Sequence, residues 1–151
     1  MIVYNAEPLD YSENAIMFWI KKGYKYYAGN WEEIDNSLLF KNVEVLIVRL
    51  ARKIDLNVLK RFPDLKTLVS ATTGLDHIDV TALEMGGIKL VSLKNHNDFL
   101  NTIPSTAEHA WALLLSLARK IPAADLHVSK GCWERDLFRG NQLKGKILGI
   151  I

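Results

Sequence analysis

The sequence predicts an α/β fold built on a doubly wound parallel sheet, and three features support this. Short β-prone runs alternate with capped helical runs along residues 1–93, which is the pattern of repeated β-α-β units. Val43–Leu50 is almost continuously apolar, as expected of a strand buried on both faces. Val69–Asp79 leads from an apolar run through a glycine turn to a helix start, which is typical of a βα loop.

The first elements can be placed from caps and breakers. Met1–Ala6 is expected to be the first strand, and Ser12 to cap a helix that ends near Lys22. Tyr24–Ala28 is rich in tyrosine and is expected to be the second strand. A short helix is expected within Trp31–Leu39, with its tryptophan sealing the sheet edge rather than lining a ligand cleft.

The next elements alternate in type. We expect strands over Val43–Leu50, Leu65–Val69 and Gly87–Leu93. Between them we expect helices over Asp55–Phe62 and Val80–Met85. Asp55 and Asp79 are the expected N-caps of the two helices, because each stands immediately before a helical run. The polar stretch Lys94–Pro104 is expected to be a crossing segment.

The remaining chain is predicted to be mostly helical. Ser105-Thr106-Ala107-Glu108 has the pattern of a capping box and predicts a helix that runs to Lys120. Its residues are apolar on almost every side, so other elements must enclose it. A second helix is expected near Ala123–Lys130, and Lys146–Ile151 is apolar and β-prone, as in a strand.

Composition excludes several classes of partner. The formal charge is +2, from 19 basic and 17 acidic residues, which argues against a nucleic-acid-binding surface. The longest apolar run, Trp111–Leu117, is too short to span a bilayer, and the N-terminus lacks the features of a signal peptide. Cys132 is the single cysteine, so no intrachain disulfide can form. The sequence therefore predicts a soluble, cytoplasmic protein with no membrane partner, in which Cys132 is a semi-buried structural thiol.

The titratable residues give no metal or acid–base pattern. No pair of histidines has the spacing of zinc ligands and only one cysteine is present, so the sequence predicts no metal site. His77 is expected to make a polar loop contact, and His109 is expected to pack and to make a buried hydrogen bond. Asp76 and Asp79 could form a carboxylate pair, but turn formation and helix capping explain them better.

The loop around Gly74 has two interpretations on local chemistry. Backbone N–H groups ahead of a helix start form an anion site in many proteins, and ligands of such sheets bind outside the carboxyl ends of the strands. Gly74 could serve such a site through φ > 0 or through close approach of a ligand. The alternative is a βα loop that binds nothing.

A resemblance bears on this choice. The motifs ATTGLDHID, STAEHAWALLLSLARKIP and GCWERDLFRGNQLKGKILGII occur in this order and resemble the D-isomer-specific 2-hydroxyacid dehydrogenases, especially the phosphoglycerate dehydrogenase and hydroxypyruvate reductase branch. The similarity runs from about Val43 to Ile151, and residues 1–42 fit by pattern only.

The resemblance implies two domains. Residues 1–100 are expected to form a flavodoxin-like substrate-binding domain. Residues 101–151 are expected to hold the interdomain helices and the first strand of an incomplete NAD-binding Rossmann domain. The family's Gly-x-Gly-x-x-Gly loop and its catalytic Arg, Glu and His are expected after Ile151, so the chain looks like a fragment without catalytic residues.

The resemblance also implies roles for individual residues. Thr73, Gly74 and Leu75 match the loop whose N–H groups hold the substrate carboxylate, and Arg49 matches an arginine beside an anionic substrate group. Thr73 and Thr106 match positions near the nicotinamide of the cofactor. Many relatives have an asparagine six positions before the motif glutamate. Here that position is Thr102, with Asn101 beside it, so no role is carried over to Asn101.

The function implied by the resemblance is reversible hydride transfer between a 2-hydroxy acid and NAD or NADP, in a homodimer. The 151-residue chain alone is expected to bind no cofactor and to be inactive. The rival is a non-catalytic flavodoxin-like module that binds an acid or a protein. The sequence does not choose among phosphoglycerate, glyoxylate or hydroxypyruvate, and bulkier 2-oxo acids, nor between NAD and NADP.

Overall fold

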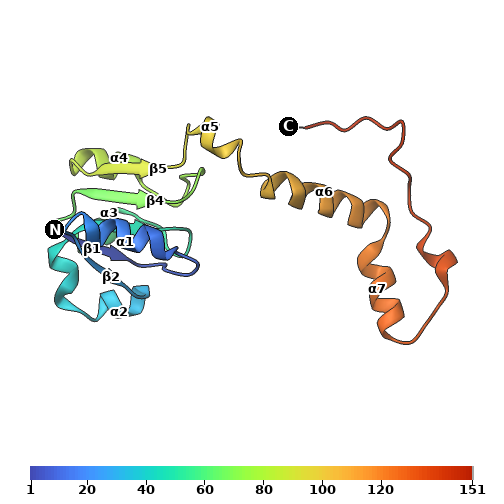
Figure 1. Cartoon of the computed structure of the whole chain (residues 1–151), viewed down its shortest axis with the longest axis horizontal. Helices are drawn as coiled ribbons and strands as arrows, with labels where there is room; N and C mark the ends of the chain where they lie inside the picture. Colours follow the sequence, from blue (N-terminus) through green and yellow to red (C-terminus); the bar gives the residue numbers. More distant parts are fainter. Residues whose placement is uncertain (151) are drawn as a thin grey trace. The chain divides into compact units, whose positions relative to one another are not determined.

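The chain divides into two compact units. A computed structural model describes residues 1–150, and the units are residues 1–97 and 98–151 (Figure 1). The first unit is an α/β domain and the second contains short helices and irregular segments.

The first unit is organised around one parallel sheet. Its five strands have the order β2-β1-β3-β4-β5. They are β1 (Ile2–Asn5), β2 (Lys25–Ala28), β3 (Val43–Val48), β4 (Thr67–Ser70) and β5 (Lys89–Ser92). This order is that of flavodoxin-like folds, with the direction of winding reversing between β1 and β3. The predicted fold class is therefore confirmed, and each predicted strand of residues 1–93 is present.

The helices cover the two faces of the sheet unequally. They are α1 (Glu13–Lys21), α2 (Trp31–Asp35), α3 (Leu56–Leu59) and α4 (Val80–Met85), with a 3₁₀ helix η1 (Leu38–Asn42). The larger core includes Leu46 and Leu68 and is covered by α2, α3 and α4. The smaller one is built on Val3 and Ile47, against Trp19 of α1. This alternation follows from the period of two along each strand.

Side-chain caps fix the starts of the helices in the first unit. Ser12, Asn30, Asp55 and Asp79 each accept a hydrogen bond from a backbone N–H in the first turn of α1, α2, α3 and α4. The expected caps at Ser12, Asp55 and Asp79 are thus confirmed. The helix expected over Asp55–Phe62 is shorter than predicted, because α3 ends at Leu59 in a tight turn.

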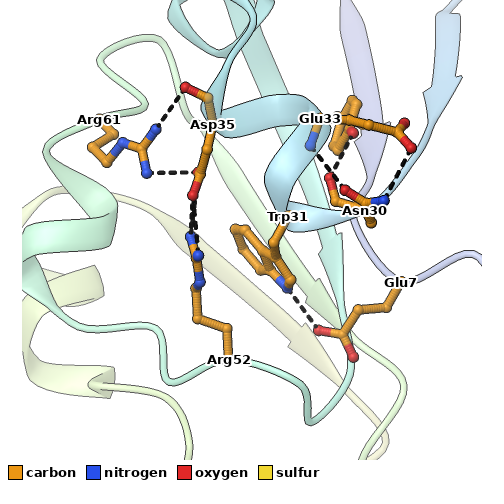
Figure 2. A network of polar contacts seen from close by, with 8 residues as sticks. Glu7, Asn30, Trp31, Glu33, Asp35, Arg52 and Arg61 are labelled. Atoms are coloured by element: carbon orange, nitrogen blue, oxygen red, sulfur yellow. Dashed lines mark hydrogen bonds and ion pairs between the residues drawn. The ribbon is translucent and has the colours of Figure 1, made fainter.

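An ionic cluster ties α2 to the chain around α3. Asp35 accepts hydrogen bonds from Arg52, at 3.0 Å, and from Arg61, at 2.6 Å (Figure 2). The Arg52 guanidinium also stacks 4.7 Å above the ring of Trp31, which is buried in the larger core as expected. Desolvation raises the pKa of Asp35, but the hydrogen bonds and charges of Arg52 and Arg61 outweigh it and hold that pKa below its usual value.

The second unit contains α6 (Ser105–Ala118), α7 (Ile121–Ser129) and a 3₁₀ helix η2 (Arg135–Phe138), and α5 (Asn97–Leu100) spans its border with the first unit. The predicted capping box does not form. Pro104 already has a helical conformation and its carbonyl accepts from Glu108, so Ser105 lies inside the helix, where it cannot act as N-cap.

The apolar end of the chain also differs from the prediction. Residues 146–150 form no strand, and Ile151 lies outside the described residues. A strand needs a hydrogen-bonded neighbour, and no described segment of the second unit is a strand that could pair with it. Among residues 1–150, no helix is both long and apolar enough to cross a membrane.

Candidate functional site

The carboxyl ends of the strands in the first unit form the candidate site. An open pocket of about 460 Å³ lies there. Its lining residues follow β3, β4 and β5 and are Leu50, Ala71, Thr72, Thr73, Gly74, Asp76, His77 and Leu93. In doubly wound sheets this edge is where ligands bind.

The loop after β4 is held by its own side chains. The hydroxyl groups of Ser70 and Thr72 lie 2.8 Å apart, and Thr72 Oγ1 donates to the Gly74 carbonyl at 2.9 Å. His77 Nε2 lies 3.4 Å from Ser70 Oγ, which is the polar loop contact expected for this histidine. Ser70 is almost fully buried, so it anchors the loop from below.

The far side of the loop is joined to the segment between β3 and α3 by backbone hydrogen bonds. Ile54 N–H donates to the His77 carbonyl at 2.7 Å, and Asp79 N–H donates to the Ile54 carbonyl at 2.9 Å. The Leu75 side chain packs against the larger core. These contacts hold Thr73, Gly74 and Leu75 as a short arch, in which Thr73 and Gly74 are exposed and line the pocket and Leu75 is half-buried.

The arch offers unpaired donors. Within residues 1–150, the backbone N–H groups of Thr73, Gly74 and Leu75 donate to no protein acceptor. Successive backbone N–H groups without a protein acceptor favour an anion, because each supplies a partial positive charge. A carboxylate could accept from two of them at once.

A second set of backbone donors lies after β3, where the direction of winding reverses. A side chain of the protein accepts hydrogen bonds from these donors. Glu7 follows β1, and its Oε2 accepts from the N–H groups of Leu50 and Ala51 at 2.9 and 3.0 Å. Its Oε1 accepts from Trp31 Nε1 at 3.3 Å, a contact drawn in Figure 2. The donors after β3 are therefore occupied by a carboxylate of the protein, whereas those after β4 remain available.

The residues expected at the site are only partly brought together. Thr73 and Gly74 line the pocket and Leu75 forms the far end of the arch. Arg49 lies just past β3, is exposed, and donates to the Leu9 carbonyl at 3.2 Å instead of lining the pocket. Thr106 is exposed in the first turn of α6, in the second unit.

Gly74 does not have the positive φ that was one of the two reasons proposed for a glycine at this position. Its φ lies outside the positive range, and an added Cβ would meet only Asp76 Oδ2, at 3.6 Å. The turn therefore does not require glycine for its backbone. Close approach of a ligand is the reason for glycine that remains.

The sequence did not single out Glu7, Ser70 or Thr72. The signal was present, since each lies at or directly after the carboxyl end of a predicted strand, where site residues of parallel sheets gather. Cys132 was expected to be semi-buried, which is wrong, because it is exposed. The prediction that the chain has no metal site depended on the spacing between histidines. The structure brings a single histidine, His127, near Cys132 and Glu134.

The family model of the D-isomer specific 2-hydroxyacid dehydrogenase catalytic domain matches residues 12–128. The chain is 38% identical over 154 residues to D-3-phosphoglycerate dehydrogenase of Archaeoglobus fulgidus, covering 100% of itself and 28% of that protein. It is 32% identical over 149 residues to hydroxypyruvate reductase of Thermotoga maritima, covering 99% of itself and 47% of that protein.

A solved structure with the same fold is D-lactate dehydrogenase from Aquifex aeolicus, complexed with NAD and lactic acid. The TM-score is 0.69 at 20% identity, over 95% of this chain and 41% of that one. At this identity the match establishes the fold alone. The chain spans less than half the length of each of these relatives.

Proposed function

Because the chain belongs to the D-isomer-specific 2-hydroxyacid dehydrogenase family, we propose that residues 1–100 are the substrate-binding domain of an NAD(P)-dependent dehydrogenase. Residues 101–151 are then the interdomain helices and the start of the cofactor domain. In the whole protein a 2-hydroxy acid loses a hydride to the nicotinamide and a proton to a base, and becomes a 2-oxo acid.

The observation that carries this proposal is the arch over the pocket. Its three unpaired N–H groups, on Thr73, Gly74 and Leu75, suit the carboxylate that every 2-hydroxy and 2-oxo acid carries. Fixing the carboxylate orients C2 and its hydroxyl group, and orientation contributes a large part of the rate enhancement in such reactions. The Ser70 and Thr72 hydroxyls hydrogen-bond to each other, and Thr72 Oγ1 donates to the Gly74 carbonyl, so the arch is supported before a ligand binds.

The residues of this chain do not themselves fit a dinucleotide. The 151 residues contain no Gly-x-Gly-x-x-Gly turn, which is the element that holds the pyrophosphate in such domains. Thr73 and Thr106 are proposed to lie near the nicotinamide, and both are exposed. Arg49 is proposed to contact a second anionic group of the substrate after leaving the Leu9 carbonyl.

The substrate-binding proposal is tested by amide NMR on the purified chain with glyoxylate or pyruvate as the probe. We expect the amide signals of Thr73, Gly74 and Leu75 to shift in a saturable way, with smaller shifts near Arg49. A dissociation constant of about 1 mM corresponds to roughly 4 kcal/mol, which a few hydrogen bonds to a carboxylate can supply. Shifts confined to other parts of the chain contradict the assignment.

A matched pair of glycine variants separates ligand approach from folding. Gly74→Ala places a methyl group on the arch, and we expect binding of glyoxylate to weaken at least about tenfold, roughly 1.4 kcal/mol. Gly149→Ala is the control, because neither glycine has positive φ and neither added Cβ meets an atom closer than 3.6 Å. Equal affinities in the two variants would mean that Gly74 is not at the ligand.

The same polypeptide provides the test for the cofactor. We expect no steady turnover of any 2-hydroxy acid with NAD or NADP, and no micromolar binding in an NADH fluorescence titration, because the pyrophosphate turn is not among these residues. Turnover would refute this expectation and leave the carboxylate site in place. Acid binding without turnover in a longer form that carries the cofactor domain would favour the rival, a non-catalytic module.

A further inference from the structure

The end of α7 and the segment after it bring three different metal-binding side chains together. A turn at Lys130 and Gly131, where Gly131 has φ of 80°, reverses the chain after the helix. Gly131 N–H donates to the Val128 carbonyl at 2.9 Å and Cys132 N–H to the His127 carbonyl at 3.3 Å. As a result, one ligand atom each of His127, Cys132 and Glu134 lies within 4.8 Å of the other two.

We propose that His127 Nε2, Cys132 Sγ and a Glu134 carboxylate oxygen bind a zinc-like divalent transition-metal ion. Imidazole, thiolate and carboxylate are the three ligand types that Zn²⁺ takes in proteins. Bond lengths of about 2.0–2.3 Å put ligand atoms roughly 3.3–3.8 Å apart around a tetrahedral ion, so atoms that lie within 4.8 Å of one another need to approach by at most about 1 Å. Water can take the fourth position.

The three side chains differ in how freely they can move. The His127 side chain is 20% exposed and its ring packs 5.0 Å from that of Phe138, so it is held in place. Cys132 is exposed and the Glu134 side chain is 67% exposed, so both can change rotamer without moving the backbone. A metal ion at His127 Nε2 takes the lone pair that now accepts from the Glu134 N–H at 3.3 Å, so closing the site replaces that hydrogen bond as well as rotating the Cys132 and Glu134 side chains.

A simple ion pair is the competing explanation, because His127 Nε2 contacts the Glu134 carboxylate directly. A proton shared by the two groups accounts for that pair, but it does not involve the Cys132 thiol beside them. A divalent cation uses all three donors, and the thiolate and carboxylate charges neutralise it. A pocket of about 180 Å³ adjoins the cluster, and His127 and Glu134 line it together with apolar residues such as Trp133 and Phe138.

The thiolate determines which metal is favoured. Soft sulfur and imidazole ligands select Zn²⁺ and similar ions over Mg²⁺ or Ca²⁺, which take oxygen ligands. The ion would link α7 to the segment that leads into η2. No residue from 98 to 150 is buried, so such a link is a source of order that the apolar residues of this unit do not supply. This proposal replaces the sequence-based expectation that the chain has no metal site.

The test is a titration of the full chain, without an affinity tag and with Cys132 kept reduced, using Co²⁺ as the spectroscopic probe. We expect one ion per chain, a thiolate-to-cobalt charge-transfer band and the visible bands of tetrahedral cobalt. Zn²⁺ should displace Co²⁺ and remove these bands. Hydrogen exchange of residues 121–138 should slow at least about tenfold with Zn²⁺ and return with a chelator.

Three variants separate this site from adventitious binding. Cys132→Ser should abolish the charge-transfer band, and His127→Gln and Glu134→Gln should each weaken Zn²⁺ binding at least about tenfold. His96→Gln and His109→Gln are the controls and should bind as the parent chain does, since neither histidine belongs to the cluster. Absence of a charge-transfer band in the parent chain, its persistence in Cys132→Ser, or equal losses in the control variants would overturn the proposal. None of these outcomes bears on the arch at Thr73–Leu75.

Discussion

The two units of the chain are both rich in apolar residues but differ in what those residues do. In residues 1–97 they fill two cores on the faces of a parallel sheet, where β3 is buried on both sides and β4 is buried on one side and half-buried on the other. From residue 98 to 150 no side chain is buried, and the apolar helix α6 leaves Leu113 58% and Leu117 81% exposed. An apolar pattern therefore predicts that a segment needs a cover, but not that its own chain supplies one.

The units also differ in how their helices begin. Those from α1 to α4 each start at a side-chain cap, whereas neither α6 nor α7 has a capping hydrogen bond from a side chain. The backbone N–H groups of an uncapped first turn rely on water, which gives a helix less local support. Both differences indicate that the first unit can hold its structure by itself, and that the second needs an added contact.

The largest expected effect is on the core of the first unit. Leu68 in β4 is fully buried, so Leu68→Ala removes its packing and leaves a cavity, and we expect the free energy of unfolding to fall by about 3 kcal/mol. Leu117→Ala removes the same atoms from an exposed position and should change the free energy of unfolding by less than about 0.5 kcal/mol. Urea denaturation followed by far-UV circular dichroism measures both. Similar losses for the two variants would mean that α6 is covered.

The next largest effect concerns the exposed apolar face of α6. We predict that a second copy of the chain packs against this face. Leu113 and Leu117 lie one turn apart on the same helix face, and burying each would contribute roughly 1.5–3 kcal/mol. We therefore expect a homodimer in analytical ultracentrifugation, and at least about a hundredfold weaker association in the double variant Leu113→Glu, Leu117→Glu.

The control for association is Leu38→Glu, which adds the same charge at a 74% exposed leucine of the first unit. The Leu38→Glu variant should sediment as the parent chain does. A strictly monomeric parent chain whose α6 amides are strongly protected from hydrogen exchange would show that the association hypothesis is wrong.

Local sequence patterns match the structure of the first unit better than that of the second for a physical reason. In the first unit, local signals agree with tertiary contacts: a capping side chain such as Asp79 precedes a helix, and an apolar run such as Val43–Val48 becomes a buried strand. In the second unit, Ser105 had the pattern of a cap but the preceding Pro104 had already entered the helix. Residues 146–150 had the composition of a strand but no described neighbour with which to pair.

The candidate site could be predicted in position but not in detail. The pattern of the loop at Thr73 and Gly74 was sufficient to place a ligand site at the carboxyl edge of the sheet. The role of Glu7 as the acceptor for donors after β3 depends on two strands separated by more than thirty residues and could not be predicted from either alone. The convergence of His127, Cys132 and Glu134 depends on the reversal at Gly131.

A smaller effect is expected from the ionic cluster of the first unit. Asp35→Asn removes the negative charge that Arg52 and Arg61 share, and we expect the free energy of unfolding at neutral pH to fall by about 1–2 kcal/mol. The control is Glu32→Gln on the same helix, since the Glu32 side chain makes no hydrogen bond or ion pair within residues 1–150. Urea denaturation of both variants at pH 7 measures the difference.

The pH dependence of that difference follows from the direction of the shift. The pKa of Asp35 is lower in the folded chain than in the unfolded one, so its stabilisation is fully present above about pH 4 and is lost as the pH falls through the folded-state value. The gap between the parent chain and Asp35→Asn should therefore shrink below about pH 4. A gap that stays constant down to pH 2 would show that the arginines do not act through the charge of Asp35.

The smallest effect distinguishes capped from uncapped helices. Asp79 accepts from the Ala82 N–H at 2.9 Å, so Asp79→Ala leaves that donor without its partner, and we expect a loss of about 1 kcal/mol. Asp79→Asn should restore most of the stability, because asparagine caps equally well and keeps the acceptor. Ser105→Ala should cost almost nothing, since Ser105 lies inside α6 and its hydroxyl caps no N–H there. Urea denaturation of the three variants, with hydrogen exchange at the first turns of α4 and α6, measures each effect. A loss at Ser105 as large as that at Asp79 would mean that α6 begins one residue later in solution, with the capping box formed after all.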